Sequence, residues 1–175
     1  IHISYYADLL ETHTVIDDNS SPDSKDRKNE NPNQIIKSMK LSNLNRLIIG
    51  QLNINSLRNK FEQLKLIVQR NIDILIMTES KLDDSFPKCQ FILEGFAPPF
   101  RLDRNRYGGG VIIYVREDLV AKELASNNLR LKYEGIFFEI NLKNRKWLMF
   151  GGYNPHKNNI TTFLNQIEFD LEFYL

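Results

Sequence analysis

The sequence predicts an α/β protein with parallel strands at its centre. Apolar runs over residues 46–53 and 72–78 flank a helical pattern over 56–70, and this is the order of a β-α-β unit, whose two strands are parallel and joined by a right-handed crossover. The second run, "IDILIMT", is continuous, as is typical of a strand buried on both faces. Segments 133–142 and 145–154, joined at Lys143–Asn144, indicate a later hairpin.

The first 43 residues are expected to be mostly disordered. Residues 1–16 carry scattered apolar positions, and 8–16 form either a short helix or no regular structure. Residues 17–34 contain no apolar residue, so they cannot bury enough surface to offset the entropy of ordering. We therefore expect a linker there, with the folded domain beginning near Leu44 and spanning 44–175.

The remaining elements follow from periodicity and turn residues. Asn55 or Ser56 is a candidate N-cap for helix 56–70. Gly108–Gly110 precede the strand expected over 110–117, so they predict a tight turn and not a nucleotide-binding loop, which follows a strand and opens a helix. A last helix, capped by Asn158 or Asn159, has an apolar stripe at helical spacing: Ile160, Phe163, Ile167, Leu171 and Leu175.

Composition fits an ordinary soluble domain. The 175 residues are 42% hydrophobic and 26% charged, with a net charge of +1, but residues 41–175 hold a surplus of three basic residues, which permits a polyanionic partner. A single cysteine excludes an internal disulfide. No apolar run approaches the roughly 18 residues that a membrane span needs, and no signal peptide is visible, so we expect an intracellular protein without a membrane partner.

Polar side chains follow the two parallel strands where each one ends. Asn53 and Asn55 close the first strand, and Glu79 closes the second. Because neighbouring strands lie about 4.8 Å apart and parallel strands end at one edge, these side chains should converge. One carboxylate beside neutral oxygen donors suits Mg²⁺, which keeps several waters and uses substrate phosphate for the rest.

Further polar groups are expected around this edge. Tyr153 and Asn154 end a later strand, and Lys81 follows Glu79; the hydroxyl and the ammonium group are phosphate donors. Arg101, Arg104 and Arg106, with Tyr107, make a basic loop suited to a DNA backbone. On residue types alone, strand-end capping and a solvated loop remain the alternatives.

Several of these segments together resemble the first half of the endonuclease/exonuclease/phosphatase family. They are "LNINSL", "DILIMTESK", the glycine turn into "GGGVIIYV", and "YNP", in this order over residues 44–175. More narrowly, the chain is similar to the apurinic-type endonuclease domain of non-LTR (LINE-like) retrotransposons. The resemblance implies a partial four-layer α/β sandwich that lacks its C-terminal half.

The resemblance also implies roles for individual residues. Asn53 and Glu79 would lie at the metal and phosphate site, with Glu79 as the main ligand of Mg²⁺, or alternatively Mn²⁺. Tyr153 would contact the scissile phosphate, and Asn55 and Lys81 would lie beside it. The implied activity is Mg²⁺-dependent nicking of DNA in the nucleus, for a downstream reverse transcriptase primed by the resulting 3′-hydroxyl.

The family's later motifs are missing from this sequence. No Gly-Asp dipeptide follows Tyr153, and no Asp-His pair occurs anywhere. We therefore expect a catalytically incomplete fragment, with metal binding weak or lost and with one apolar sheet face uncovered. The alternative is a non-catalytic half-domain that binds nucleic acid or a protein partner, such as the missing C-terminal half.

Overall fold

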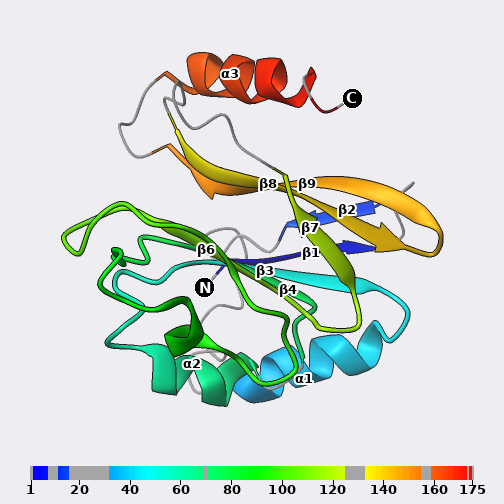
Figure 1. Cartoon of the computed structure of the whole chain (residues 1–175). Helices are drawn as coiled ribbons and strands as arrows, with labels where there is room; N and C mark the ends of the chain where they lie inside the picture. Colours follow the sequence, from blue (N-terminus) through cyan, green and yellow to red (C-terminus); the bar gives the residue numbers. More distant parts are fainter. Residues whose placement is uncertain are drawn as a thin grey trace, which may run out of the picture.

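The computed structural model describes residues 2–7, 12–15, 32–68, 71–124, 133–154, 159–172 and 174. Within them, helices and strands form a mixed α/β structure with two sheets (Figure 1). The larger sheet has the strand order β2-β1-β3-β4-β6-β5, and the smaller has the order β7-β8-β9. Helices α1 (Pro32–Ser42) and α2 (Phe61–Val68) lie below the larger sheet, and α3 (Ile160–Glu172) lies above the smaller one.

The centre of the larger sheet contains the expected β-α-β unit. Strand β3 (Leu47–Asn53) and strand β4 (Ile74–Thr78) are parallel neighbours on either side of α2 in the sequence. Their register sets Asn53 opposite Thr78, so both strands end at one edge. Strand β6 (Val111–Val115) is antiparallel to β4, and every residue of β4 and β6 is buried. The prediction of a strand buried on both faces is confirmed.

Outer strands complete both sheets. In the larger sheet, β1 (His2–Ala7) pairs with β3 and with β2 (Thr12–Val15), and β5 (Phe100–Leu102) pairs with β6. In the smaller sheet, β8 (Glu134–Leu142) pairs with β7 (Val120–Glu123) and β9 (Arg145–Tyr153). The β8–β9 hairpin is the expected one, and its turn residues Lys143 and Asn144 have the positive φ values of a two-residue hairpin turn.

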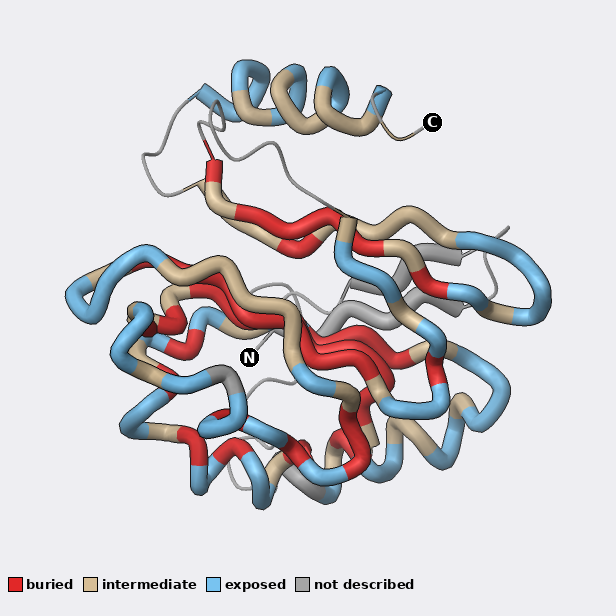
Figure 2. The backbone as a smooth tube through the Cα atoms, viewed as in Figure 1, coloured by how far each residue is buried: buried red, intermediate tan, exposed pale blue. Residues whose placement is uncertain are grey.

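Two apolar clusters hold the layers together, and Figure 2 shows buried residues concentrated on the strands of both sheets. One joins α1 and α2 to the larger sheet, through residues such as Ile36, Leu64 and Tyr114. The other fills the space between the sheets, with Ile74 and Ile113 facing Phe138. Gly151 permits this packing, because a Cβ there would press on the Ile76 and Ile113 side chains.

The structure differs from expectation before residue 44 and at the start of α2. Helix α1 covers residues expected to lie outside the folded domain, and Ile36 is only 2% exposed; Pro32 suits the first turn, where its missing N–H costs nothing. Residues 12–15 form a strand, whereas we expected a short helix or no regular structure. The linker residues 17–31 lie outside the described residues. Helix α2 begins at Phe61, so neither Asn55 nor Ser56 is its N-cap; both have positive φ values instead.

Helix α3 packs on the outer face of the smaller sheet through Phe163 and Asp170, whereas we expected an open apolar face. Asn159 accepts a hydrogen bond from the Thr161 N–H (2.9 Å) and caps α3; Asn158 and Leu175 lie outside the described residues. The Phe163 ring meets Tyr133 edge-on at 5.9 Å, and the Tyr133 hydroxyl donates to Asp170 (2.6 Å). The exposed apolar side chains Ile160, Leu164 and Phe169 lie on α3 itself.

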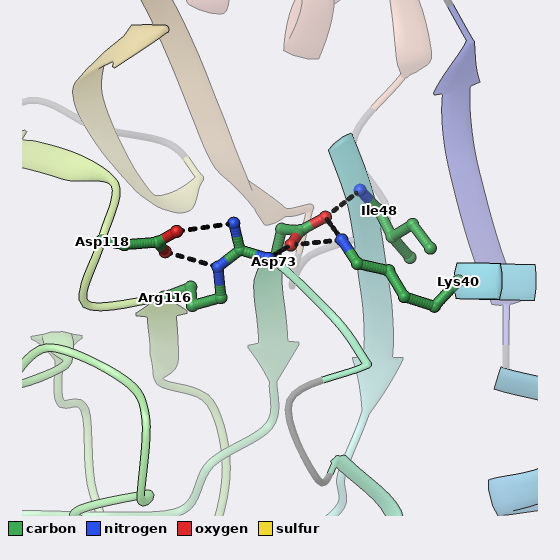
Figure 3. Close-up of polar contacts among 5 residues, drawn as sticks. All are labelled: Lys40, Ile48, Asp73, Arg116 and Asp118. Atoms are coloured by element: carbon green, nitrogen blue, oxygen red, sulfur yellow. Dashed lines mark hydrogen bonds and ion pairs between the residues drawn. The ribbon is translucent and has the colours of Figure 1, made fainter. Parts of the chain in front are cut away.

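A buried carboxylate, that of Asp73, ties α1 to the larger sheet. It lies at the end of the sheet opposite the C-terminal ends of β3 and β4. Asp73 is 1% exposed and binds Lys40 Nζ (2.7 Å), the Ile48 N–H (2.7 Å) and Arg116, which also pairs with Asp118 (Figure 3). The charges of the two acids, Asp73 and Asp118, balance those of the two bases, Lys40 and Arg116. A buried charge such as that of Asp73 needs a partner of opposite charge. Among the described residues, no helix has the length and apolarity needed to cross a bilayer.

Candidate active site

Three chain segments lie side by side beyond the ends of β3 and β4. The Ser56 N–H donates to the Glu79 carbonyl (2.9 Å), and the Leu57 N–H donates to the Ser80 carbonyl (2.9 Å). On the other side, the Lys81 N–H donates to the Gly109 carbonyl (3.0 Å). Residues 79–81 are therefore held between the segment after β3 and the glycine turn before β6.

The smaller sheet adds two side chains from its own edge. Glu134 is the first residue of β8 and Tyr153 is the last residue of β9, and the two face each other in the register of the hairpin. The Tyr153 hydroxyl lies 2.7 Å from Glu79 Oε1 and 3.1 Å from Glu134 Oε2. The site is thus assembled from both sheets, with groups 74 positions apart in direct contact.

Glu79 is the carboxylate at the centre of this arrangement. It accepts hydrogen bonds from the Tyr153 hydroxyl on one oxygen and from the Gly109 N–H (2.9 Å) on the other. Burial acts to raise the pKa of Glu79, but these two hydrogen bonds and the charges of Lys81 and Arg104 outweigh it, so the pKa lies below its ordinary value. Glu79 is therefore ionised at neutral pH.

Tyr153 keeps its proton. Burial, the hydrogen bond to Glu79 and the negative charges of Glu134 and Glu79 all raise the pKa of Tyr153. The single hydroxyl proton is directed to Glu79, the nearer of the two carboxylates. Tyr153 is thus a neutral hydrogen-bond donor.

The backbone of this edge is strained. Six residues other than glycine have positive φ in the described part of the chain, and four of them are here: Asn55, Ser56, Glu79 and Lys81. Such conformations cost about 1–3 kcal/mol each and concentrate at functional sites. The observation motivates the assignment of function to this edge.

The predicted asparagines and Lys81 lie on the same edge but make contacts of their own. The Asn53 side chain accepts a hydrogen bond from the Asn55 N–H (3.1 Å), and Asn55 Oδ1 accepts one from Lys81 Nζ (2.6 Å). Both asparagines are exposed. The two strands end at one edge, as expected, but the contacts described for the Glu79 carboxylate are with Tyr153 and Gly109 and not with the two asparagine side chains.

The predicted basic loop divides into two parts. Arg104 is 43% exposed, and its Nη1 pairs with Glu134 Oε1 at 2.8 Å. Arg106 is 67% exposed, lies 3.6 Å from Asp83 and stacks near the Tyr107 ring. Arg101 pairs with Asp103 (2.6 Å) and is 4% exposed, so it supports the loop and does not face solvent. Asn154 is half-buried just after β9.

Sequence reasoning missed Glu134. Glu134 and Glu139 both lie in the predicted strand "YEGIFFEINL", and nothing in the sequence of that segment distinguishes one from the other. The available signal was positional, because the first residue of one hairpin strand faces the last residue of the other. Glu134 is 15% exposed and also accepts the Gly110 N–H (2.6 Å).

No family model matches the sequence, and no curated protein matches it. The site is therefore interpreted from its geometry and chemistry.

The donor set fits a hard cation. Carboxylate oxygens of Glu79 and Glu134 lie around one hydroxyl group, and oxygen ligands are the ones that Mg²⁺ prefers. In the part of the chain that the structure describes, no group of three or more His, Cys, Asp or Glu side chains could hold a metal.

Proposed function

We propose that this edge is the metal and phosphate site of a Mg²⁺-dependent DNA endonuclease, carried here in catalytically incomplete form. The supporting observation is the contact between Glu79 and Tyr153 at the point where β3, β4 and β9 end and β8 begins. A carboxylate held ionised beside a neutral hydroxyl donor provides a cation ligand and a phosphate donor in one place.

The proposed site follows the general chemistry of phosphodiester cleavage. Glu79, with Asn53 beside it, would hold Mg²⁺, which when bound supplies Lewis acidity at phosphorus. Tyr153 would donate its hydroxyl to a non-bridging phosphate oxygen. Lys81 and Asn154 lie at the rim, where they would orient the backbone. This arrangement is the one expected in the endonuclease/exonuclease/phosphatase sandwich that the sequence resembles.

The chain should not cut DNA by itself. Within its 175 residues no Gly-Asp dipeptide follows Tyr153 and no Asp-His pair occurs, so the groups that orient the attacking water and act at the reacting phosphate are missing. We propose that they belong to a C-terminal half and that a reverse transcriptase lies further downstream.

A plasmid assay tests the proposal. Supercoiled DNA with Mg²⁺ or Mn²⁺ should stay intact with this chain alone, and should be nicked once a segment with the missing motifs is supplied. Glu79→Gln should abolish that nicking, and Asp84→Asn, an exposed acid change outside the site, should not. Nicking that survives Glu79→Gln would contradict the assignment.

The alternative is a non-catalytic domain that binds nucleic acid. It is favoured by the outward position of Arg106 and by Tyr107, which is 83% exposed. Salt-dependent DNA binding by this chain, with no nicking after the missing motifs are supplied, would support this alternative.

A further inference from the structure

We propose that Glu134 competes with phosphate for Arg104, and so limits the affinity of this edge for a nucleic-acid backbone. The proposal rests on the proposed function, because it assumes that phosphate binds here. It adds a role for a residue that the sequence left unassigned.

The contact between the two side chains is asymmetric. Arg104 Nη1 lies 2.8 Å from Glu134 Oε1, and the arginine side chain is 43% exposed while the glutamate is 15% exposed. The guanidinium group therefore reaches solvent, and the carboxylate stays fixed. A phosphate arriving from solvent meets Arg104 already paired.

Glu134 occupies the position that an anionic ligand would take. Its Oε2 accepts the Gly110 N–H (2.6 Å) and lies 3.1 Å from the Tyr153 hydroxyl, while Oε1 accepts Arg104. A guanidinium group, a backbone N–H and a hydroxyl are the donors that bind phosphate oxygens in proteins. The carboxylate therefore saturates the guanidinium group and the backbone N–H, two donors that a phosphate would use.

The electrostatics point the same way. The hydrogen bond and charge of Glu134 raise the pKa of Arg104, which shows that the pair stabilises the charged guanidinium group. Two acids and two bases share the edge: Glu79 and Glu134, Lys81 and Arg104. Removing the Glu134 charge leaves Arg104 free to pair with a phosphate.

The test compares Glu134→Gln with Glu139→Gln. Glu139 lies on the same strand and pairs with Lys146 at 3.2 Å, so this control removes the same charge and a similar ion pair away from the site. Binding of a short fluorescent DNA duplex is measured by anisotropy over a series of NaCl concentrations. Glu134→Gln should bind about fivefold tighter than the control, and one added phosphate contact should steepen the salt slope by about 0.9.

Two further variants separate competition from simple charge loss. Glu134→Asp keeps the charge but retracts the carboxylate, so it should also bind DNA more tightly than the wild type. Adding Arg104→Gln to either variant should remove the gain. Circular dichroism checks that each variant is folded. If Glu134→Gln is not folded, the test is made with Glu134→Asp.

The outcomes distinguish this inference from the proposed function. If the wild type binds DNA, and Glu134→Gln, Glu134→Asp and Glu139→Gln bind it with the same affinity, the competition is overturned. The proposed function is not affected by that result. Weaker binding by both Glu134 variants would assign Glu134 a structural role and would also overturn it. No DNA binding by any variant at low salt would overturn both proposals.

Discussion

Tyr153 and Glu79 determine each other's protonation. The hydroxyl donates to the carboxylate at 2.7 Å, which lowers the pKa of Glu79 and raises that of Tyr153. Tyr153→Phe removes this donor and keeps the ring, so the pKa of Glu79 should rise toward its ordinary value. Carboxyl ¹³C NMR titration measures the shift, and Tyr133→Phe, whose hydroxyl binds Asp170 on the other face of the sheet, should leave Glu79 unchanged.

The same contact gives a pH dependence of stability with a definite sign. Because the folded-state pKa of Glu79 is lowered, its contribution is fully present above the unfolded-state value of about 4.3 and is lost as the pH falls through the folded-state pKa. Tyr153→Phe should therefore be less stable than the wild type at neutral pH, and the difference should shrink in acid. Urea unfolding of the two proteins at neutral and at acidic pH measures this stability difference. A difference that grows in acid would contradict the prediction.

Gly110 is required at the centre of the site. Its φ is +88°, and a Cβ there would collide with Ser80 Oγ. Gly110→Ala should lower the free energy of unfolding by about 1–3 kcal/mol because of the strained backbone, and by more if Ser80 cannot move. Gly108→Ala is the matched control, since its nearest neighbour would be Glu79 Oε2 at 3.8 Å. Equal losses in chemical denaturation would contradict the argument.

Among the elements, α1 depends most clearly on one buried charge. Asp73 joins Lys40 of α1 to Arg116 and to the start of β3 (Figure 3). Asp73→Asn leaves Lys40 without its carboxylate partner and Arg116 with Asp118 alone, and should cost about 3–5 kcal/mol of stability. Asp118→Asn, at an acid that is 61% exposed, should cost about 1 kcal/mol or less. Similar losses of stability in the two variants, measured by thermal or urea unfolding, would contradict this role of Asp73.

Helix α3 is fastened through its inner aromatic face. Phe163 packs on Tyr133, while Phe169 is 70% exposed. Phe163→Ala should therefore destabilise the protein clearly, whereas Phe169→Ala should change stability by about 0.5 kcal/mol or less, as exposed substitutions do. Comparable effects in urea denaturation would mean that α3 does not pack in this orientation.

Sequence patterns predicted elements well where the signal is local. The run "IDILIMT" and the flanking strand and helix were enough to predict a parallel pair with Asn53, Asn55 and Glu79 at one edge. Helix α1 was missed because Pro32, Asn33 and Gln34 continue a polar segment, although Ile36 and Met39 follow at helical spacing. Helix α2 begins later than its apolar spacing predicts, and the positive φ values at Asn55 and Ser56 have no marker in the sequence.

In the molecule as a whole, several contacts between distant segments could not be predicted, although Tyr153 and Glu79 were expected at one edge and are in contact. Asp73 meets Lys40 and Arg116 from two other elements, and periodicity does not specify such partners. Glu134 reaches the site only because two sheets pack face to face. Helix α3 also packs on the smaller sheet through contacts between distant segments, where an uncovered face had been expected.

The whole account depends on cation binding at Glu79. The direct measurement is paramagnetic broadening of backbone amide NMR signals by a low concentration of Mn²⁺. We predict selective broadening of Gly109, Ser56 and Lys81, whose backbones surround Glu79, and its loss in Glu79→Gln. Broadening centred on other acidic residues, or unchanged in Glu79→Gln, would contradict the account.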